Sequence, residues 1–342
     1  MADVKGYLEF SSPSEFTLKF GFSGQKGWDG LMEYSTNLSD WIEWDSSLIN
    51  SINGKLYLRG TGNTTVSNLG PTQTSFVFEG ENISCIGRID TLLDYQTVLD
   101  GGEPVMSHYC CARLFKGCTA LVQAPELPAT TLSDYCYESM FDGCVLLKAS
   151  PKLPAITLKY MCYNGMFYGC TGLIQGSELP AVILEPGCYG SMYENCTSLV
   201  VAPKLLATTS KNSYGYMFYG CTSLTTISSL AMITLGPREC WSMFGDCTSL
   251  KISETQDDEY KYPIIFAPEG ATPVGAWNRG MLSGTGGTFT GDPEIGVTYY
   301  TTHTHDEPTP PTTQQKLYYN GKPTKMYYNG KEAKIYYNGK LI

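Results

Sequence analysis

A short frame recurs six times in the middle of this chain, and it restricts the folds that the sequence can adopt. Each copy contains Leu or Met, an aromatic residue, one variable residue, then Gly, Asn or Asp, and finally a cysteine that we call the anchor. The anchors are separated by 25 or 26 residues and are Cys118, Cys144, Cys170, Cys196, Cys221 and Cys247. A period of this length predicts a solenoid, in which each repeat buries its apolar side against its neighbours. Solenoids mostly bind and space other molecules, so the period favours a binding protein over an enzyme.

The apolar positions of the frame predict a core of stacked ladders. An aromatic residue stands three positions before each anchor, and Leu stands three positions after it. The residue directly before the anchor is of a type that tolerates a left-handed backbone, so we expect a short helical turn to end there. A short strand is expected to follow and to stop at a proline such as Pro125 or Pro203, because proline lacks the backbone donor.

The chain has 13 cysteines, and two interpretations of them are open. Four lie eight residues before an anchor, namely Cys110, Cys136, Cys162 and Cys188. They could form disulfides within each repeat, or they could be reduced thiols packed as small buried hydrophobes. Ser213 replaces this cysteine in the fifth copy and the total is odd, which favours reduced thiols in a protein made in a cytosol. The lack of a CxxC pair argues against a zinc site.

The remaining segments divide the chain into further units, and the whole is expected to be mainly β with short helical turns. Residues 1–100 show alternating runs between Gly, Asn and Ser clusters, which predict an antiparallel β-sandwich. The tryptophans there are interpreted as core residues, with a sugar-stacking platform as the alternative; they are Trp28, Trp41 and Trp44. Residues 101–255 form the solenoid, 256–302 its C-terminal cap and 303–316 a semi-rigid Pro/Thr linker.

A second repeat, Tyr-Tyr-Asn-Gly-Lys, occurs three times in residues 317–342. Asn-Gly between alternating residues is a strong hairpin signal, so the tail is predicted to form a four-stranded meander. One small sheet cannot bury its own apolar face, so that face is expected to join copies of the chain as a homotrimer, or to dock to another protein. The face collects Leu317, Tyr319, Met326, Tyr328, Ile335, Tyr337 and Ile342.

Composition excludes several classes of function. The net charge of −10 disfavours nucleic acid and anionic membranes as partners. The first residues lack the apolar segment of a signal peptide, and no apolar run is long enough to span a membrane. The chain has three histidines and neither Gly-x-Ser-x-Gly nor a phosphate loop, and its acidic residues do not recur at fixed repeat positions. A non-enzymatic protein without an organic cofactor is therefore expected.

Two sets of repeat residues are candidate ligand contacts. A regular surface binds through residues that vary on a fixed frame, and the variable position lies two residues before the anchor. It holds Lys116, Asp142, Tyr168, Glu194 and Tyr219, with Gly245 in the sixth copy. A recurrent tyrosine could add a stacking ladder, with core packing as the alternative; this second set is Tyr137, Tyr163, Tyr189 and Tyr214.

The histidine pair His303-Thr304-His305 is a candidate metal site at the start of the linker. In an extended chain alternate side chains face the same way, so both imidazoles can point inward. Three chains around an axis would offer six nitrogens, which suit an octahedral iron or nickel ion. The alternative is two solvated histidines beside the linker.

The repeat frame also resembles a known family. The second copy reads Cys136-Tyr137-x-x-Met140-Phe141-x-Gly143-Cys144, followed by Leu153-Pro154-Ala155-x-Thr157-Leu158. This pattern resembles the BspA-like leucine-rich repeats of gut Bacteroidales and their phages over about residues 5–300, and Trp277–Gly284 resembles their closing segment. The tail resembles tyrosine–glycine repeats of phage structural and fibre proteins.

The resemblance implies a virion protein of a gut phage, made in the bacterial cytoplasm. It implies a head or tail fibre, or a decoration protein, that displays leucine-rich repeats for adhesion to a host cell-surface protein or glycan. Other virion proteins and further copies of the chain are the implied partners. The alternatives are a bacterial cell-surface adhesin and a glycan depolymerase.

Overall fold

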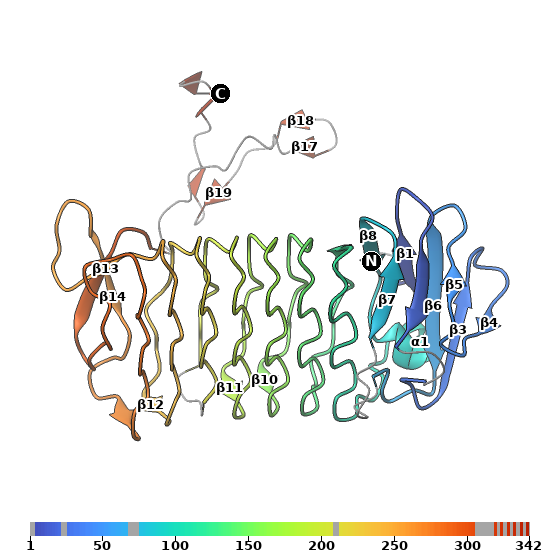
Figure 1. Ribbon diagram of the computed structural model, residues 1–342, viewed down its shortest axis with the longest axis horizontal. Coiled ribbons are helices and arrows are strands. Elements are labelled where there is room, and N and C mark those ends of the chain that lie inside the picture. Colours follow the sequence, from blue (N-terminus) through green and yellow to red (C-terminus); the bar gives the residue numbers. More distant parts are fainter. Residues whose placement is uncertain are drawn as a thin grey trace. The chain divides into compact units, whose positions relative to one another are not determined.

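The structure is a computed structural model that describes residues 4–21, 26–67, 75–207 and 212–304, together with the backbone of short strands between 318 and 341. The protein is mainly β, with several small sheets and no closed one among the described residues, which include a single helix. The chain divides into two compact units, Met1–His305 and Asp306–Ile342. In the first unit, the N-terminal strands lead into a row of stacked repeats (Figure 1).

Two sheets build the N-terminal part. The six-stranded sheet has the order β4 (Ile42–Glu43), β3 (Leu31–Ser35), β6 (Lys55–Thr61), β1 (Leu8–Ser11), β8 (Ile83–Ile86) and β9 (Leu121–Gln123). The three-stranded sheet has the order β5 (Ile49–Asn50), β2 (Thr17–Phe20) and β7 (Phe76–Glu79). The strand pairs are antiparallel except β8 with β9. Because β9 lies in the first repeat, the larger sheet joins the N-terminal strands to the repeats.

Aromatic side chains fill the space between these two sheets. Phe10 of β1 lies 5.7 Å from Phe76 and 5.3 Å from Phe78 of β7, measured between ring centroids. Trp28 and Trp44 are buried and stack at 5.2 Å, which places both in the core. Trp41 is half-buried.

The helix α1 (Thr91–Leu99) packs against β6. Gly60 of β6 permits this contact, because a Cβ there would lie 1.7 Å from the carbonyl oxygen of Leu92. A side chain at this position would push the helix away from the sheet.

The segment before each anchor is a series of turns, and the expected helical turn is wrong. In the first copy the N–H of Cys111 donates to the carbonyl of Cys136 in the next repeat, at 2.9 Å, whereas the N–H of Ala112 donates to Tyr109 in its own repeat, at 3.0 Å. This alternation continues to the anchor. An α-helix would use every backbone N–H for hydrogen bonds within its own repeat. Turns form instead, because they leave alternate N–H groups to donate to the neighbouring repeat.

The turns place left-handed residues at regular positions, and those directly before the anchors agree with the prediction. The φ angles there are +75°, +77°, +66°, +61°, +70° and +56° for Gly117, Gly143, Gly169, Asn195, Gly220 and Asp246. Four and eight residues earlier the backbone is left-handed as well, for example at Arg113 and Tyr109.

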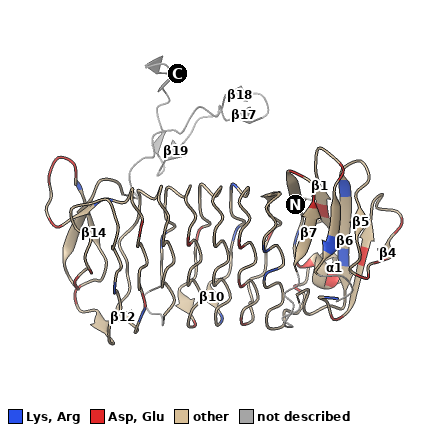
Figure 2. Ribbon diagram, in the orientation of Figure 1, with Lys and Arg blue, Asp and Glu red and all other residues tan. Residues whose placement is uncertain are grey.

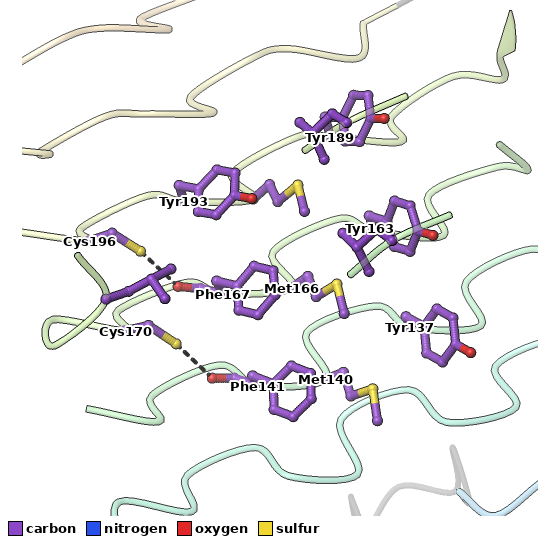
Figure 3. Packing of buried hydrophobic residues seen from close by; sticks show 14 of the residues in the cluster. Tyr137, Met140, Phe141, Tyr163, Met166, Phe167, Cys170, Tyr189, Tyr193 and Cys196 are labelled. Atoms are coloured by element: carbon purple, nitrogen blue, oxygen red, sulfur yellow. Dashed lines mark hydrogen bonds between the residues drawn. The ribbon is translucent and has the colours of Figure 1, made fainter. Parts of the chain in front are cut away.

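Aromatic rings and thiols link each repeat to the one before it. The six aromatic rings at the position three before the anchor stack with centroids 5.4–5.7 Å apart. From the second copy on, each anchor thiol lies 3.0–3.2 Å from the carbonyl oxygen of the aromatic residue in the preceding repeat. Figure 3 shows two of these contacts, from Cys170 to Phe141 and from Cys196 to Phe167. All 13 cysteines are buried and free of disulfides.

The strand expected after each anchor is shorter than the sequence predicts. The first copy forms β9 there and the sixth forms the two-residue strand Ile252–Ser253, whereas the copies between them form single parallel bridges from Ala149 to Gln175 to Val201 to Thr226. Elsewhere in the repeats, β10 (Thr157–Leu158) pairs with β11 (Ile183–Leu184) in parallel, and β12 (Thr234–Leu235) pairs with β15 (Thr272–Pro273).

Both ends of the row are covered. At the start, Phe76 of β7 takes the place of a preceding aromatic residue, because its carbonyl accepts the Cys118 thiol at 3.2 Å and its ring lies 5.3 Å from Phe115. At the end, residues 277–285 continue the frame without cysteines: the N–H of Phe244 donates to Met281, and Thr285 occupies the anchor position. A sheet of β13 (Ile252–Ser253), β16 (Thr298–Thr301) and β14 (Tyr262–Ile265) follows.

In the second unit the described backbone forms three two-stranded antiparallel pairs, and the four-stranded meander stays a prediction. The antiparallel pairs are β17 (Tyr318–Tyr319) with β18 (Lys322–Pro323), β19 (Tyr327–Tyr328) with β20 (Lys331–Glu332), and β21 (Tyr336–Tyr337) with β22 (Lys340–Leu341). Each pair encloses an Asn-Gly, as the hairpin signal predicts, but each strand has only two residues and Pro323 offers no N–H to extend β18. The docking residues Leu317, Met326, Ile335 and Ile342, and the side chains of Tyr319, Tyr328 and Tyr337, lie outside the described part of the chain.

Candidate functional site

The residues two positions before the anchors form one continuous row, which we call the variable column. The N–H before each anchor donates to the carbonyl of the column residue in the next repeat, at 2.7–2.8 Å. This bond places the six column residues side by side along the turns, in the order Lys116, Asp142, Tyr168, Glu194, Tyr219 and Gly245. The first five are at least partly exposed, and Gly245 is buried. The structure therefore brings the first predicted set of ligand contacts together.

At the N-terminal end of the variable column, oppositely charged side chains form an ion pair with each other. The Nζ of Lys116 lies 2.8 Å from a carboxylate oxygen of Asp142. Beside this pair, Arg113 and Glu138 form another ion pair at 3.3 Å. Charged residues are sparse along the row of repeats as a whole (Figure 2). A side chain that already forms an ion pair gains little free energy by exchanging its partner for a charged ligand. This end of the column is therefore a poor binding surface.

The C-terminal end of the column places a carboxylate between two tyrosines. Tyr168 and Tyr219 flank Glu194 in the column, and Tyr168 is 38% exposed. Partial burial raises the pKa of the Glu194 carboxyl, and a hydrogen bond with Ser191 opposes that shift. Among the described residues no cation pairs with Glu194, so its carboxylate is available as an acceptor.

Two residues missed by the sequence prediction support these tyrosines. Asn195 Nδ2 donates to the hydroxyl of Tyr168 at 3.4 Å, and the hydroxyl of Tyr219 donates to Asp246 Oδ2. The bond to Asp246 raises the pKa of Tyr219. The sequence signal for both was present: the repeats that follow a column tyrosine carry Asn or Asp before the anchor, whereas the others carry Gly.

A further tyrosine from the fifth repeat widens this surface. Tyr216 is 42% exposed, and its ring meets that of Tyr219 edge-on at 5.9 Å. We call Tyr168, Glu194, Tyr216 and Tyr219 the tyrosine–glutamate surface. It offers exposed aromatic faces beside one unpaired carboxylate.

The second predicted set of ligand contacts lies in the core, which corrects its assignment to the surface. Tyr137, Tyr163, Tyr189 and Tyr214 are at most 2% exposed and stack at 5.9–6.2 Å. The first three are labelled in Figure 3, where Tyr137 and Tyr163 lie to the right of Met140 and Met166. Desolvation raises the pKa of all four hydroxyls. Packing, the alternative interpretation, therefore describes these tyrosines.

The candidate metal site is only partly described. His303 is exposed, and its Nδ1 lies 2.8 Å from the hydroxyl of the adjacent Thr302. His305 lies outside the described residues. Within the described ranges, no group of three or more His, Cys, Asp or Glu side chains is placed to hold a metal ion.

Comparisons with known proteins add no assignment: no protein-family model, curated protein or solved structure matches this chain. In the part of the chain that the structure describes, no helix has the length and apolar character needed to cross a membrane. The chemistry of the tyrosine–glutamate surface is therefore the basis for a functional assignment.

Proposed function

We propose that this chain is a non-enzymatic adhesion protein. In this proposal, residues 101–255 are a leucine-rich-repeat solenoid of the BspA-like kind, and residues 1–100 are a β-sandwich at its start. The turn side of the solenoid binds a host-surface glycan or protein through the tyrosine–glutamate surface. The observation that carries the proposal is the unpaired Glu194 between two tyrosines on an otherwise repetitive frame.

The chemistry of this surface suits a sugar. The apolar face of a pyranose packs on an exposed aromatic ring, and Tyr168 and Tyr216 expose theirs. A carboxylate accepts hydrogen bonds from sugar hydroxyls, which Glu194 can do without breaking an ion pair. Asn195 and Asp246 hold the two tyrosine hydroxyls, so less side-chain freedom is lost on binding.

We further propose that the protein is a phage virion component, as a head or tail fibre or decoration protein. Residues 317–342 would join copies of the chain, as a trimer, or dock it to other virion proteins. Three hairpins of identical motif support a repeated docking piece. Mass spectrometry of purified phage particles tests this: absence of the chain from the particles would leave the bacterial surface adhesin as the better assignment.

Binding to host cells and to immobilised host glycans tests the adhesion proposal. The double variant Tyr168→Ala/Tyr219→Ala should lose most of its binding while its thermal unfolding stays near that of the parent, since Tyr168 and Tyr219 lie on the surface. The matched control, Lys116→Ala/Asp142→Ala, alters the same column at its neutralised end and should bind normally. Unchanged binding by the tyrosine variant would sink the assignment, and release of shortened glycan by the parent protein would show a depolymerase instead.

A further inference from the structure

Two arginines lie over one tryptophan at the C-terminal end of the repeats. The guanidinium carbons of Arg238 and Arg279 are 4.9 and 5.9 Å from the ring centroid of Trp241. We call these three residues the arginine–tryptophan cluster. Arg238 and Trp241 belong to the sixth repeat, and Arg279 belongs to the cysteine-free frame of residues 277–285. The backbone bond from the Ser242 N–H to the Arg279 carbonyl, at 3.0 Å, joins the two segments.

The two arginines of the cluster are exceptional in this acidic chain. Arg59, Arg88 and Arg113 each bind a carboxylate at 2.6–3.3 Å. Arg238 and Arg279 are exposed and form no ion pair within the described ranges.

Nearby carboxylates are engaged with other donors. Asp246 accepts the Tyr219 hydroxyl, and Asp292 accepts the N–H groups of Gly280 and Met281. The guanidiniums of the cluster are therefore available to an anion from outside the chain.

The indole holds the arginines in place. Its Nε1 donates to the carbonyl of Ala276 at 2.9 Å, which fixes the ring beside the segment that carries Arg279. Covering an indole with the apolar stems of arginines is a common packing arrangement. Packing alone needs only the apolar stems of these side chains. It does not require two positive charges without a described carboxylate partner over the same ring, in a chain whose net charge is −10.

We propose that Arg238, Trp241 and Arg279 form a binding site for the carboxylate groups of an acidic polysaccharide. A guanidinium presents parallel N–H donors that match the two oxygens of a carboxylate, and stacking on the indole orients them. The Tyr216 N–H donates to the Trp241 carbonyl at 2.8 Å, so the cluster adjoins the repeat that carries Tyr216 and Tyr219. A polymer lying along the turns could contact both. The choice of a glycan as the polymer rests on the proposed function. The assignment of an anion-binding site to the arginine–tryptophan cluster does not.

Titration calorimetry with defined polymers tests the site. Polygalacturonate should bind the full-length protein, more weakly as salt is added, and neutral dextran should not bind. The variant Arg238→Gln/Arg279→Gln should bind polygalacturonate at least about tenfold more weakly. The matched control is Lys148→Gln/Lys152→Gln, which removes the same charge from two exposed lysines without a described ion pair and should bind normally. No binding by the parent, or equal loss in both variants, would overturn the proposal.

Two more comparisons separate the possible causes. The variant Arg238→Lys/Arg279→Lys keeps both charges but lacks the guanidinium fork, so it should also bind more weakly than the parent; full binding would overturn the guanidinium assignment. Inorganic phosphate and dextran sulfate test the source of the anion, and tighter binding of either than of polygalacturonate would overturn the carboxylate assignment. The Tyr168→Ala/Tyr219→Ala variant should still bind polygalacturonate through the arginines, so the anion site and the adhesion proposal can fail separately.

Discussion

At the scale of single residues, the position before each anchor combines a backbone requirement with a steric one. Its left-handed backbone can be predicted from the Gly, Asn and Asp found there. The steric coupling between repeats cannot be predicted from the residue types, because it joins positions 25 or more residues apart. A Cβ at Gly220 would lie 2.3 Å from Asn195 Oδ1, and a Cβ at Gly284 would lie 2.3 Å from Asp246 Oδ1. Each Asn or Asp at this position thus requires Gly in the next repeat.

This coupling predicts that two chemically identical substitutions differ in cost. Gly117→Ala places a Cβ in open space at φ +75°, so it should destabilise by the backbone penalty of about 1–2 kcal/mol. Gly220→Ala has a similar φ, +70°, and adds the contact with Asn195, so its cost should be clearly larger. Urea unfolding measures both free energies, and equal values would show that Asn195 moves away without cost.

Tyr193 predicts a second contrast, between two buried hydroxyls. The Ser177 N–H donates to the Tyr193 hydroxyl at 3.1 Å, and Gly176 leaves room for that oxygen. Tyr193→Phe should therefore cost about 1–3 kcal/mol, because a buried N–H loses its acceptor. The Tyr214 hydroxyl is buried and has no hydrogen-bond partner among the described residues, so Tyr214→Phe should be neutral or stabilising. Similar destabilisation by both substitutions, in urea unfolding, would contradict this assignment.

At the scale of elements, the sequence predicts the periodic contacts better than the conformations. Ladders of aromatic rings and leucines follow from the period alone, since equivalent residues of stacked repeats must meet. The expected helical turn is wrong because sequence patterns do not show how many backbone N–H groups the neighbouring repeat takes. In copies two to five the strand after the anchor is reduced to single bridges, such as that between Ala149 and Gln175.

The buried anchor thiols predict that stability falls at alkaline pH. Burial raises the pKa of the Cys170 and Cys221 thiols to about 12, from about 9 for an exposed thiol. Below pH 9 both the folded and unfolded states hold these protons. Between pH 9 and 12 only the unfolded state releases them, so stability is lost as the pH rises.

The expected loss is about 2 kcal/mol for each thiol on going from pH 8 to pH 10.5, since one pH unit corresponds to about 1.4 kcal/mol. Urea unfolding at the two pH values measures it. The Cys170→Ala/Cys221→Ala variant is less stable at pH 8 but should show a smaller decrease at pH 10.5. A decrease as large as that of the parent would show that other groups, such as the buried tyrosines, cause the effect.

At the scale of the whole molecule, the variable column shows what the sequence can predict of the candidate site. Variation on a fixed frame correctly groups Lys116, Asp142, Tyr168, Glu194 and Tyr219 in one row. The sequence does not show that the first two neutralise each other, because that depends on side-chain distances. Recurrence alone does not place Tyr137 and its equivalents, which are buried rather than part of a binding surface. A residue that recurs in successive repeats is as consistent with a core ladder as with a ligand-binding ladder.

The division of the chain into two units predicts that the tail controls assembly without stabilising the repeats. Residues Met1–His305 form a compact unit whose described residues include a continuous apolar core, from Leu8 to Tyr299. Deleting residues 306–342 should therefore leave the thermal unfolding midpoint of this unit unchanged. If the tail joins copies of the chain, as proposed, light scattering should show a full-length oligomer and a truncated monomer. A truncated protein that keeps the oligomeric mass would place the assembly contacts in the first unit, and two monomeric products would leave docking to another virion protein as the role of the tail.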